Sequence, residues 1–136
     1  MNRLVVDAGA FIGLFYSKDT HHSQCVQGFS QLAHQNVTLL VSIPIVFEVY
    51  KWLLQKTSVL VARRSLQIMR ESIHTVPVNQ SDFEELQAML ERLSDWQGTL
   101  EDASVISTAI RYKCAVWTFN YRDFVAFNEI EFWNPE

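Results

Sequence analysis

Short apolar runs along the chain alternate with longer segments in which apolar residues recur every three or four positions. A short apolar run bounded by turn residues predicts a buried strand, whereas the wider spacing predicts an amphipathic helix. Strands are expected at residues 3–6, 38–42, 74–78 and 115–118, with an edge strand at 131–133. Helices are expected at residues 10–16, 20–34, 44–57, 60–73, 81–95 and 100–113.

Residues at the ends of these segments support several of the helices. Pro44 stands in the first turn of its helix, a position that proline favours. Ser81 and Glu84 have the spacing of a capping box, which predicts that a helix begins there. Thr99 is the expected cap of the next helix, which runs from about Leu100.

The alternation of buried strands with helices predicts an α/β protein. We expect a three-layer α/β/α sandwich with a central, mostly parallel twisted sheet of four to five strands. The chain has 136 residues, only four glycines and three prolines, and no linker-like or repeated segment. We therefore expect one domain over residues 1–136.

Composition and charge narrow the classes of function. The hydrophobic content of 49% excludes a disordered chain, and the formal net charge of −4 excludes an electropositive nucleic-acid-binding surface. Any contact with nucleic acid must therefore be local or assisted by a metal. Cys25 and Cys114 fit free thiols in a reducing compartment, and no apolar run is long enough to span a bilayer. We expect a cytoplasmic protein without a membrane segment.

Acidic and amide side chains stand where the predicted strands end. Asp7 directly follows the first strand, and Asn120 and Asp123 follow the strand at 115–118. Glu48 lies one turn into the helix after the second strand, and Asp102 lies in the first turn of the helix at 100–113. Ligands of open parallel sheets gather at the carboxyl ends of the strands. These oxygen-bearing side chains would suit Mg²⁺ or Mn²⁺, and without a cation they would repel one another.

Each of these acids also has an ordinary structural explanation. Asp7 and Asp102 could cap helices, Asp123 could be a turn residue, and Glu48 could belong to a solvated stripe with Lys51. These explanations do not account for the placement of all these acids at the same edge of the predicted sheet. Glu48 in particular is flanked by apolar residues on both sides, which is an expensive environment for an unpaired charge.

Four sequence blocks contain these residues: VVDAGAFIGLF, KDTHHSQC, IPIVFEVYKWL and LEDASVISTAIRYKCAVWTFNYRDF. Together they cover nearly the whole chain and resemble the PIN domains, and within that family the single-domain VapC-type toxins of bacterial toxin–antitoxin pairs. The combination of blocks is specific, although no single block is. In the second block the resemblance leaves Asp19, His21 and His22 with structural roles.

The resemblance implies a metal-dependent endoribonuclease that hydrolyses RNA with a carboxylate-bound Mg²⁺ or Mn²⁺. Asp7, Glu48 and Asp102 are then the metal ligands, directly or through water. Thr118 and Asn120 become candidates for positioning the ligands or a water molecule. The family resemblance also implies a homodimer and a small antitoxin partner that covers the acidic pocket, inserting a basic side chain among the carboxylates.

The chain departs from the family pattern at Asn120, where many members have a fourth aspartate. Asn120 still offers an oxygen, but the missing charge should weaken a second metal site, and Asp123 is the other candidate for the fourth metal-site residue. The substitution keeps a second hypothesis open: a PIN-fold module without strong catalysis that binds RNA or a protein partner.

Two other α/β classes fit the sequence less well. A phosphoaspartyl phosphatase needs a second aspartate two residues after the first, and this position is Gly9. A receiver domain needs an acidic pair around the end of its first strand, which the segment RLVVD lacks.

Overall fold

Four parallel strands form the centre of the molecule. The computed structural model describes residues 1–136, and its strands are β1 (Arg3–Val6), β2 (Thr38–Ser42), β3 (His74–Val76) and β4 (Ala115–Trp117). They lie in the order β3-β2-β1-β4, and every neighbouring pair is parallel. The expected parallel α/β sheet of four to five strands is confirmed.

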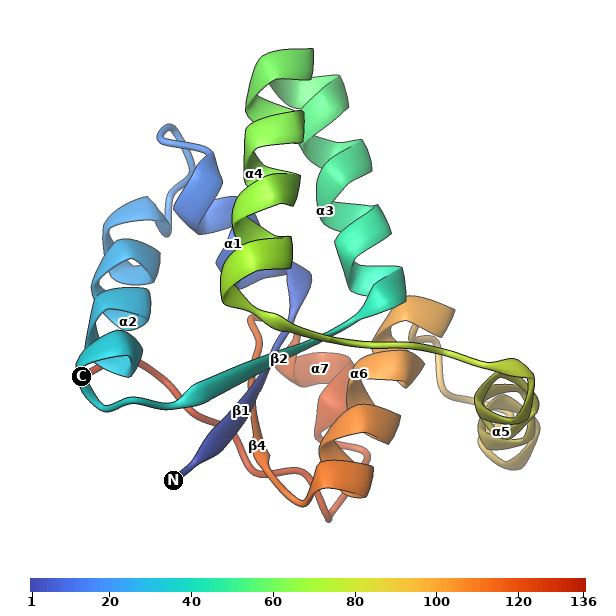
Figure 1. Cartoon of the computed structure of the whole chain (residues 1–136). Coiled ribbons are helices and arrows are strands. Elements are labelled where there is room, and N and C mark those ends of the chain that lie inside the picture. Colours follow the sequence, from blue (N-terminus) through green and yellow to red (C-terminus); the bar gives the residue numbers. More distant parts are fainter.

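Helices cover both faces of this sheet (Figure 1). They are α1 (Ala8–Phe15), α2 (His22–His34), α3 (Ile43–Lys56), α4 (Val59–Ser72), α5 (Gln80–Arg92), α6 (Leu100–Tyr112) and the short α7 (Tyr121–Phe124). Side chains of α1, α2 and α4 meet over one face, while α6 packs against β1, β2 and β4 from the other. The three expected layers are therefore present, with α3 and α4 side by side in a hairpin that rises beyond the sheet.

The buried residues of the strands explain why the sheet needs two layers of helices. Leu4, Val5 and Val6 are consecutive in β1, so their side chains point to alternating faces, and all three are fully buried. A strand that is apolar on both faces is stable only when both faces are covered.

Several expected elements differ from the structure at their ends. The helix expected at 10–16 spans Ala8–Phe15, the helix expected at 20–34 begins at His22, and the strand expected at 74–78 ends at Val76. Helix α5 begins at Gln80 and ends at Arg92, and its capping box joins Asn79 to Asp82 rather than Ser81 to Glu84. The Asn79 side chain accepts from the Asp82 amide at 2.9 Å, and the Asp82 carboxylate accepts from the Asn79 amide at 3.0 Å. Asparagine is as good a cap as serine, so the earlier pair starts the helix.

The expected edge strand at 131–133 is reduced to one bridge between Phe132 and Val116. The segment does run beside β4, because the Val116 amide donates to Glu131 and the Trp133 amide donates to Val116. This segment thus covers the outer edge of β4 but does not add a fifth strand to the sheet.

The order of the strands places a crevice between β1 and β4. The chain steps from β1 to β2 and β3 towards one edge, and then returns to the opposite side of β1 with β4. In open parallel sheets such a reversal leaves space at the carboxyl ends of the strands. None of the helices combines the length and apolar character that crossing a membrane requires.

Candidate metal centre at the carboxyl edge of the sheet

Asp7 lies at this reversal point, and hydrogen bonds fix both of its carboxylate oxygens. It follows β1 directly and caps α1, because Oδ1 accepts from the Ala8 amide at 2.8 Å. Oδ2 accepts from the hydroxyl of Thr118, the residue that follows β4, at 2.7 Å. The Asp7 carboxylate is buried, with 6% of the residue exposed. The Asp7 side chain therefore links the end of β1 to the end of β4.

Asp102 enters the same region from the first turn of α6. It forms a capping box with Thr99: the Thr99 hydroxyl accepts from the Asp102 amide, and Asp102 Oδ2 accepts from the Thr99 amide, both at 3.0 Å. Asn120 Nδ2 also donates to Oδ2, at 3.3 Å. Since these side-chain contacts all fall on Oδ2, Oδ1 remains free of protein donors. Asp102 therefore caps α6 and also lies near Asp7.

Asn120 connects the remaining groups. Its amide nitrogen Nδ2 donates to Asp123 Oδ2 at 3.0 Å as well as to Asp102, and its backbone amide donates to the Thr118 hydroxyl at 2.9 Å. Asp123 lies in α7, and its Oδ2 is also 3.4 Å from the Arg122 guanidinium. Hydrogen bonds from Asn120 and then Arg122 lower the pKa of Asp123. Asp123 is thus linked to Asp102 through the Asn120 amide.

Glu48 approaches from α3, which packs against α1 and α6. The Ser42 hydroxyl, immediately before α3, lies 2.7 Å from the Ser104 hydroxyl of α6, and this buried hydrogen bond ties the two helices together. Glu48 itself is half-buried, and no protein group donates a hydrogen bond to its carboxylate. Burial first, and then repulsion from Asp7, Glu101 and Asp102, raises its pKa to about 7.

Glu101 is a further member of this acidic environment, and its sequence position alone did not mark it as a site residue. It precedes Asp102 in the first turn of α6, is partly buried, and repels the charge of Glu48. Its only sequence signal is its position beside Asp102.

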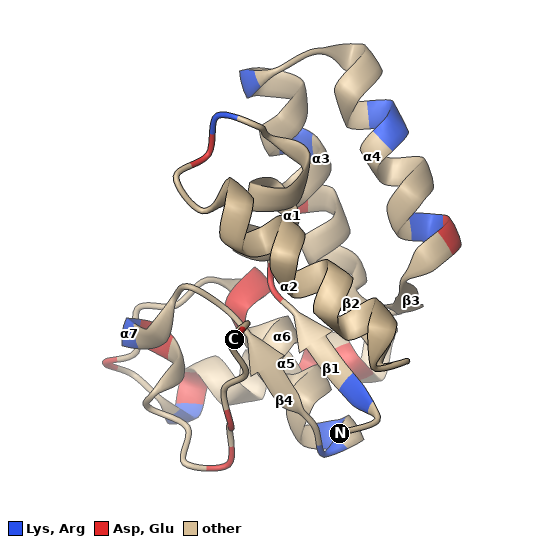
Figure 2. Ribbon diagram, turned by 90° about the vertical axis from the view of Figure 1, so that its left-hand side faces the viewer, with Lys and Arg blue, Asp and Glu red and all other residues tan.

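The cluster has no basic counterpart. Burial raises the pKa of Asp7 to about 6, and Asp102 adds to the rise. The ion pairs of the chain join Arg111 to two residues of α5 and Arg122 to Asp123, so none neutralises Asp7, Glu48 or Asp102. In Figure 2 acidic segments (red) stand together where β1 ends and α6 begins, whereas basic segments (blue) mark the α3–α4 hairpin and the opposite end of the sheet.

These residues fit a hard divalent cation in their chemistry. Their donors are oxygens, and the buried negative charge lacks a partner, which a cation would supply. No three His, Cys, Asp or Glu side chains of the chain form a ready-made metal-binding group. Mg²⁺ does not require one, because it usually retains several waters and takes only one or two carboxylates directly.

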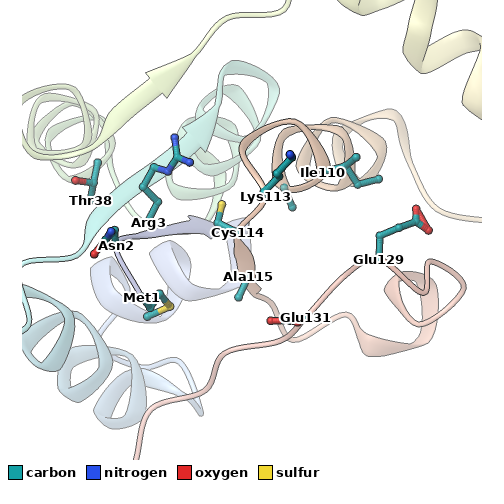
Figure 3. A pocket seen from close by; sticks show the side chains of 11 residues that line it. Met1, Asn2, Arg3, Thr38, Ile110, Lys113, Cys114, Ala115, Glu129 and Glu131 are labelled. Atoms are coloured by element: carbon teal, nitrogen blue, oxygen red, sulfur yellow. The ribbon is translucent and has the colours of Figure 1, made fainter.

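A large hollow lies elsewhere on the molecule (Figure 3). It has a volume of about 870 Å³ and is lined by residues at the amino ends of the strands, including Arg3, Thr38 and Ala115, together with Lys113 after α6. It is therefore at the opposite edge of the sheet from Asp7 and Thr118.

Comparisons with known proteins agree with this architecture. The family profile described as the PIN domain matches residues 4–130. VapC20 of Mycobacterium tuberculosis, described as a sarcin–ricin loop cleaving toxin, superposes with a TM-score of 0.77 at 15% identity, over 93% of this chain and 98% of that one. VapBC2 of Rickettsia felis, bound to a fragment of its promoter DNA, gives 0.72 at 16% identity, over 97% and 99%.

A third structure, FitAcB of Neisseria gonorrhoeae, gives a TM-score of 0.68 at 13% identity, over 97% of both chains. No curated protein matches the chain significantly in sequence. At these identities the solved structures establish the fold alone. The match of the family profile to nearly all of the sequence establishes more: the chain belongs to the PIN domain family.

Proposed function

We propose that this protein is a VapC-like endoribonuclease that hydrolyses phosphodiester bonds of RNA with Mg²⁺ or Mn²⁺. One observation carries the proposal. Asp7, Glu48 and Asp102 come from three distant segments, gather at the carboxyl edge of the sheet and have no basic partner. Such a cluster weakens the folded protein unless a cation binds it, so its presence favours a metal-dependent function.

The three acids have the role of cation ligands, directly or through water. A bound cation would supply positive charge for the phosphate and lower the pKa of a water molecule. Thr118 holds the Asp7 carboxylate through its hydroxyl, and Asn120 holds Asp102. These are positioning roles, because each fixes the direction in which an acid presents its free lone pairs. Asp123 is the outer acid of the centre, reached through Asn120.

The similar structures support the reaction class. VapC20 is described as a toxin that cleaves the sarcin–ricin loop, and another similar structure is described as a toxin–antitoxin complex from Klebsiella pneumoniae. An acidic protein can act on RNA in the cytoplasm if a cation, rather than a basic surface, meets the phosphate.

Exposed apolar side chains support a protein partner. Several stand on the α3–α4 hairpin: Phe47, Leu54, Val59, Leu60, Leu66 and Ile68. Phe47 is 71% exposed and is adjacent in sequence to Glu48. An apolar surface of this kind beside a catalytic centre suits both a second copy of the chain and a small antitoxin that covers the centre.

Cleavage of a mixed pool of structured RNAs by the purified protein tests the proposal. We expect cutting with Mg²⁺ or Mn²⁺, none with a chelator, and a loss of at least a hundredfold in the Asp7→Asn variant, which keeps the shape of the side chain but removes its charge. Asn128→Asp, on an exposed loop, is the control for an unrelated charge change. Full activity of Asp7→Asn, or cutting that survives chelation, would contradict the proposal.

One feature supports a second candidate function, a PIN-fold binding module with weak or no catalysis. The Asn120 amide stands between Asp102 and Asp123, where many family members have an acid. Normal folding without Mn²⁺ binding and without RNA cleavage would favour this alternative.

A further inference from the structure

Two aromatic rings are stacked face to face at the rim of the candidate metal centre. The rings of His21 and Phe119 have centroids 4.4 Å apart and planes inclined by only 10°. His21 is exposed at the start of α2, and Phe119 is half-buried after β4. The pair therefore presents the outer face of the His21 ring to solvent, supported from behind by Phe119.

Local contacts fix the backbone at His21 and place Phe119 against α1. The His21 amide donates to Asp19 Oδ2 at 2.9 Å, which fixes the turn before α2. Phe119 lies on the first turn of α1, so close that a Cβ on Gly9 would be 2.8 Å from its ring. Because Gly9 has no side chain, the Phe119 ring can approach this turn closely. A platform that is rigid before binding loses little entropy when a ligand stacks on it.

The platform adjoins the proposed catalytic groups through the chain itself. Phe119 stands between Thr118, whose hydroxyl donates to Asp7, and Asn120, whose side chain donates to Asp102. Gly9, under the Phe119 ring, is two residues from Asp7. A nucleotide whose phosphate approached the acids would bring a neighbouring base within reach of these rings.

We infer that the exposed face of His21, backed by Phe119, is a stacking site for an unpaired nucleobase beside the scissile phosphate. The inference rests on the proposed function and specifies its substrate: RNA with an unstacked base at the cleavage site, as in a loop or single strand. Stacking suits this protein because every base has an aromatic face and the interaction does not need positive charge, of which the site has little.

Binding of a fluorescein-labelled, mixed-sequence single-stranded RNA tests the inference in an Asp7→Asn parent that does not cut it. We expect His21→Ala to weaken binding roughly tenfold, and His21→Phe, which retains a flat ring, to restore it. His34→Ala is the matched control, because His34 is an exposed histidine at the other end of α2. The affinity of the His34→Ala variant for the RNA should equal that of the parent.

A second measurement separates stacking from a purely structural role of the pair. Single nucleotides of the probe are replaced by abasic ones. We expect one position at which removal of the base weakens RNA binding by the parent about as much as His21→Ala does. The His21→Ala variant should bind the RNA with the same affinity whether or not this base is present.

Unchanged affinity of His21→Ala would overturn the stacking site while leaving the nuclease proposal intact. The same conclusion would follow if His21→Phe bound as weakly as His21→Ala with an unchanged melting temperature. If the parent failed to bind the probe and the wild type failed to cut RNA, the proposed function and the stacking site would both be wrong.

Discussion

At the scale of single residues, the candidate centre is organised by side chains that each contact two partners. Thr118 receives a hydrogen bond from Asn120 and donates one to Asp7, and the Asn120 amide donates to two carboxylates. Asp102 both caps a helix and takes part in this network. Because the members share partners, substitutions among them should not be additive.

Asn120→Asp should separate the structural and metal-binding effects of this network. Without metal, the variant loses two donated hydrogen bonds and places a third carboxylate between Asp102 and Asp123. We expect a free energy of unfolding about 1 to 3 kcal/mol lower than that of the wild type in EDTA. Added Mn²⁺ should then raise the melting temperature of the variant more than that of the wild type, because the new charge attracts the cation.

Thermal melts with EDTA and with Mn²⁺ measure both effects. Asn128→Asp is again the control, since it makes the same charge change at an exposed position. Equal stability of Asn120→Asp and wild type in EDTA would show that the Asn120 amide does not hold the two carboxylates together.

At the scale of elements, close packing fixes where the helices stand. Helix α2 lies on β4 at Gly28, where a Cβ would be 2.5 Å from the fully buried Trp117 ring. The same ring packs against Phe29 and Trp133, with centroids 4.9 and 5.1 Å away. The position of α2, and with it that of His21 at its start, therefore depends on a residue without a side chain.

Gly28→Ala should destabilise the fold although alanine is the better helix former. The added methyl must push α2 away from Trp117, and overpacking of this kind typically costs about 1 to 3 kcal/mol, against a gain of about 1 kcal/mol in helix propensity. Urea unfolding measures the difference. Gln24→Ala, at an exposed position of α2, should be neutral. A Gly28→Ala variant as stable as the wild type would mean that α2 can shift freely on β4.

At the scale of the whole molecule, the net charge is small, but several acidic side chains are placed where they repel one another. A net charge of −4 is modest for a chain of 136 residues. The acids at the carboxyl edge nevertheless lie where burial and mutual repulsion oppose their ionisation. The metal-free protein therefore stores unfavourable energy in the region that we propose as its active site.

The stability of the metal-free protein should fall as the pH rises from 5 to 8. The pKa of Asp7 rises from 3.8 to about 6 on folding, and that of Glu48 from 4.5 to about 7. The folded state thus binds more protons than the unfolded state in this window, so each group stabilises the fold at low pH and loses this contribution as it ionises. The combined loss should be about 2 to 4 kcal/mol.

Urea unfolding in EDTA at several pH values measures this slope. The double variant Asp7→Asn, Glu48→Gln should have a nearly flat profile, and Mn²⁺ should restore stability to the wild type at pH 8. Stability of the wild type that is constant or increases between pH 5 and 8 would contradict the burial of these charges.

Much of the fold was predictable from local pattern. The residues of β1 and β2 were predicted to the residue, because a short apolar run with turn residues at its ends admits few alternatives. The Thr99 cap was equally clear, because its hydrogen bonds join residues three positions apart. The start of α5 was wrong by one residue and its cap by two, since two overlapping pairs, Asn79–Asp82 and Ser81–Glu84, could each begin it.

The sequence by itself determined which acids stand at strand ends and helix starts, because these positions follow from short-range hydrogen bonding and periodicity. Only the tertiary structure decided that Glu101 lies near Glu48, that one Asn120 amide joins two carboxylates, and that His21 stacks on Phe119. Such contacts join residues far apart in the chain. Their geometry depends on how α2, α3 and α6 pack, and packing is a property of the complete core rather than of any local segment.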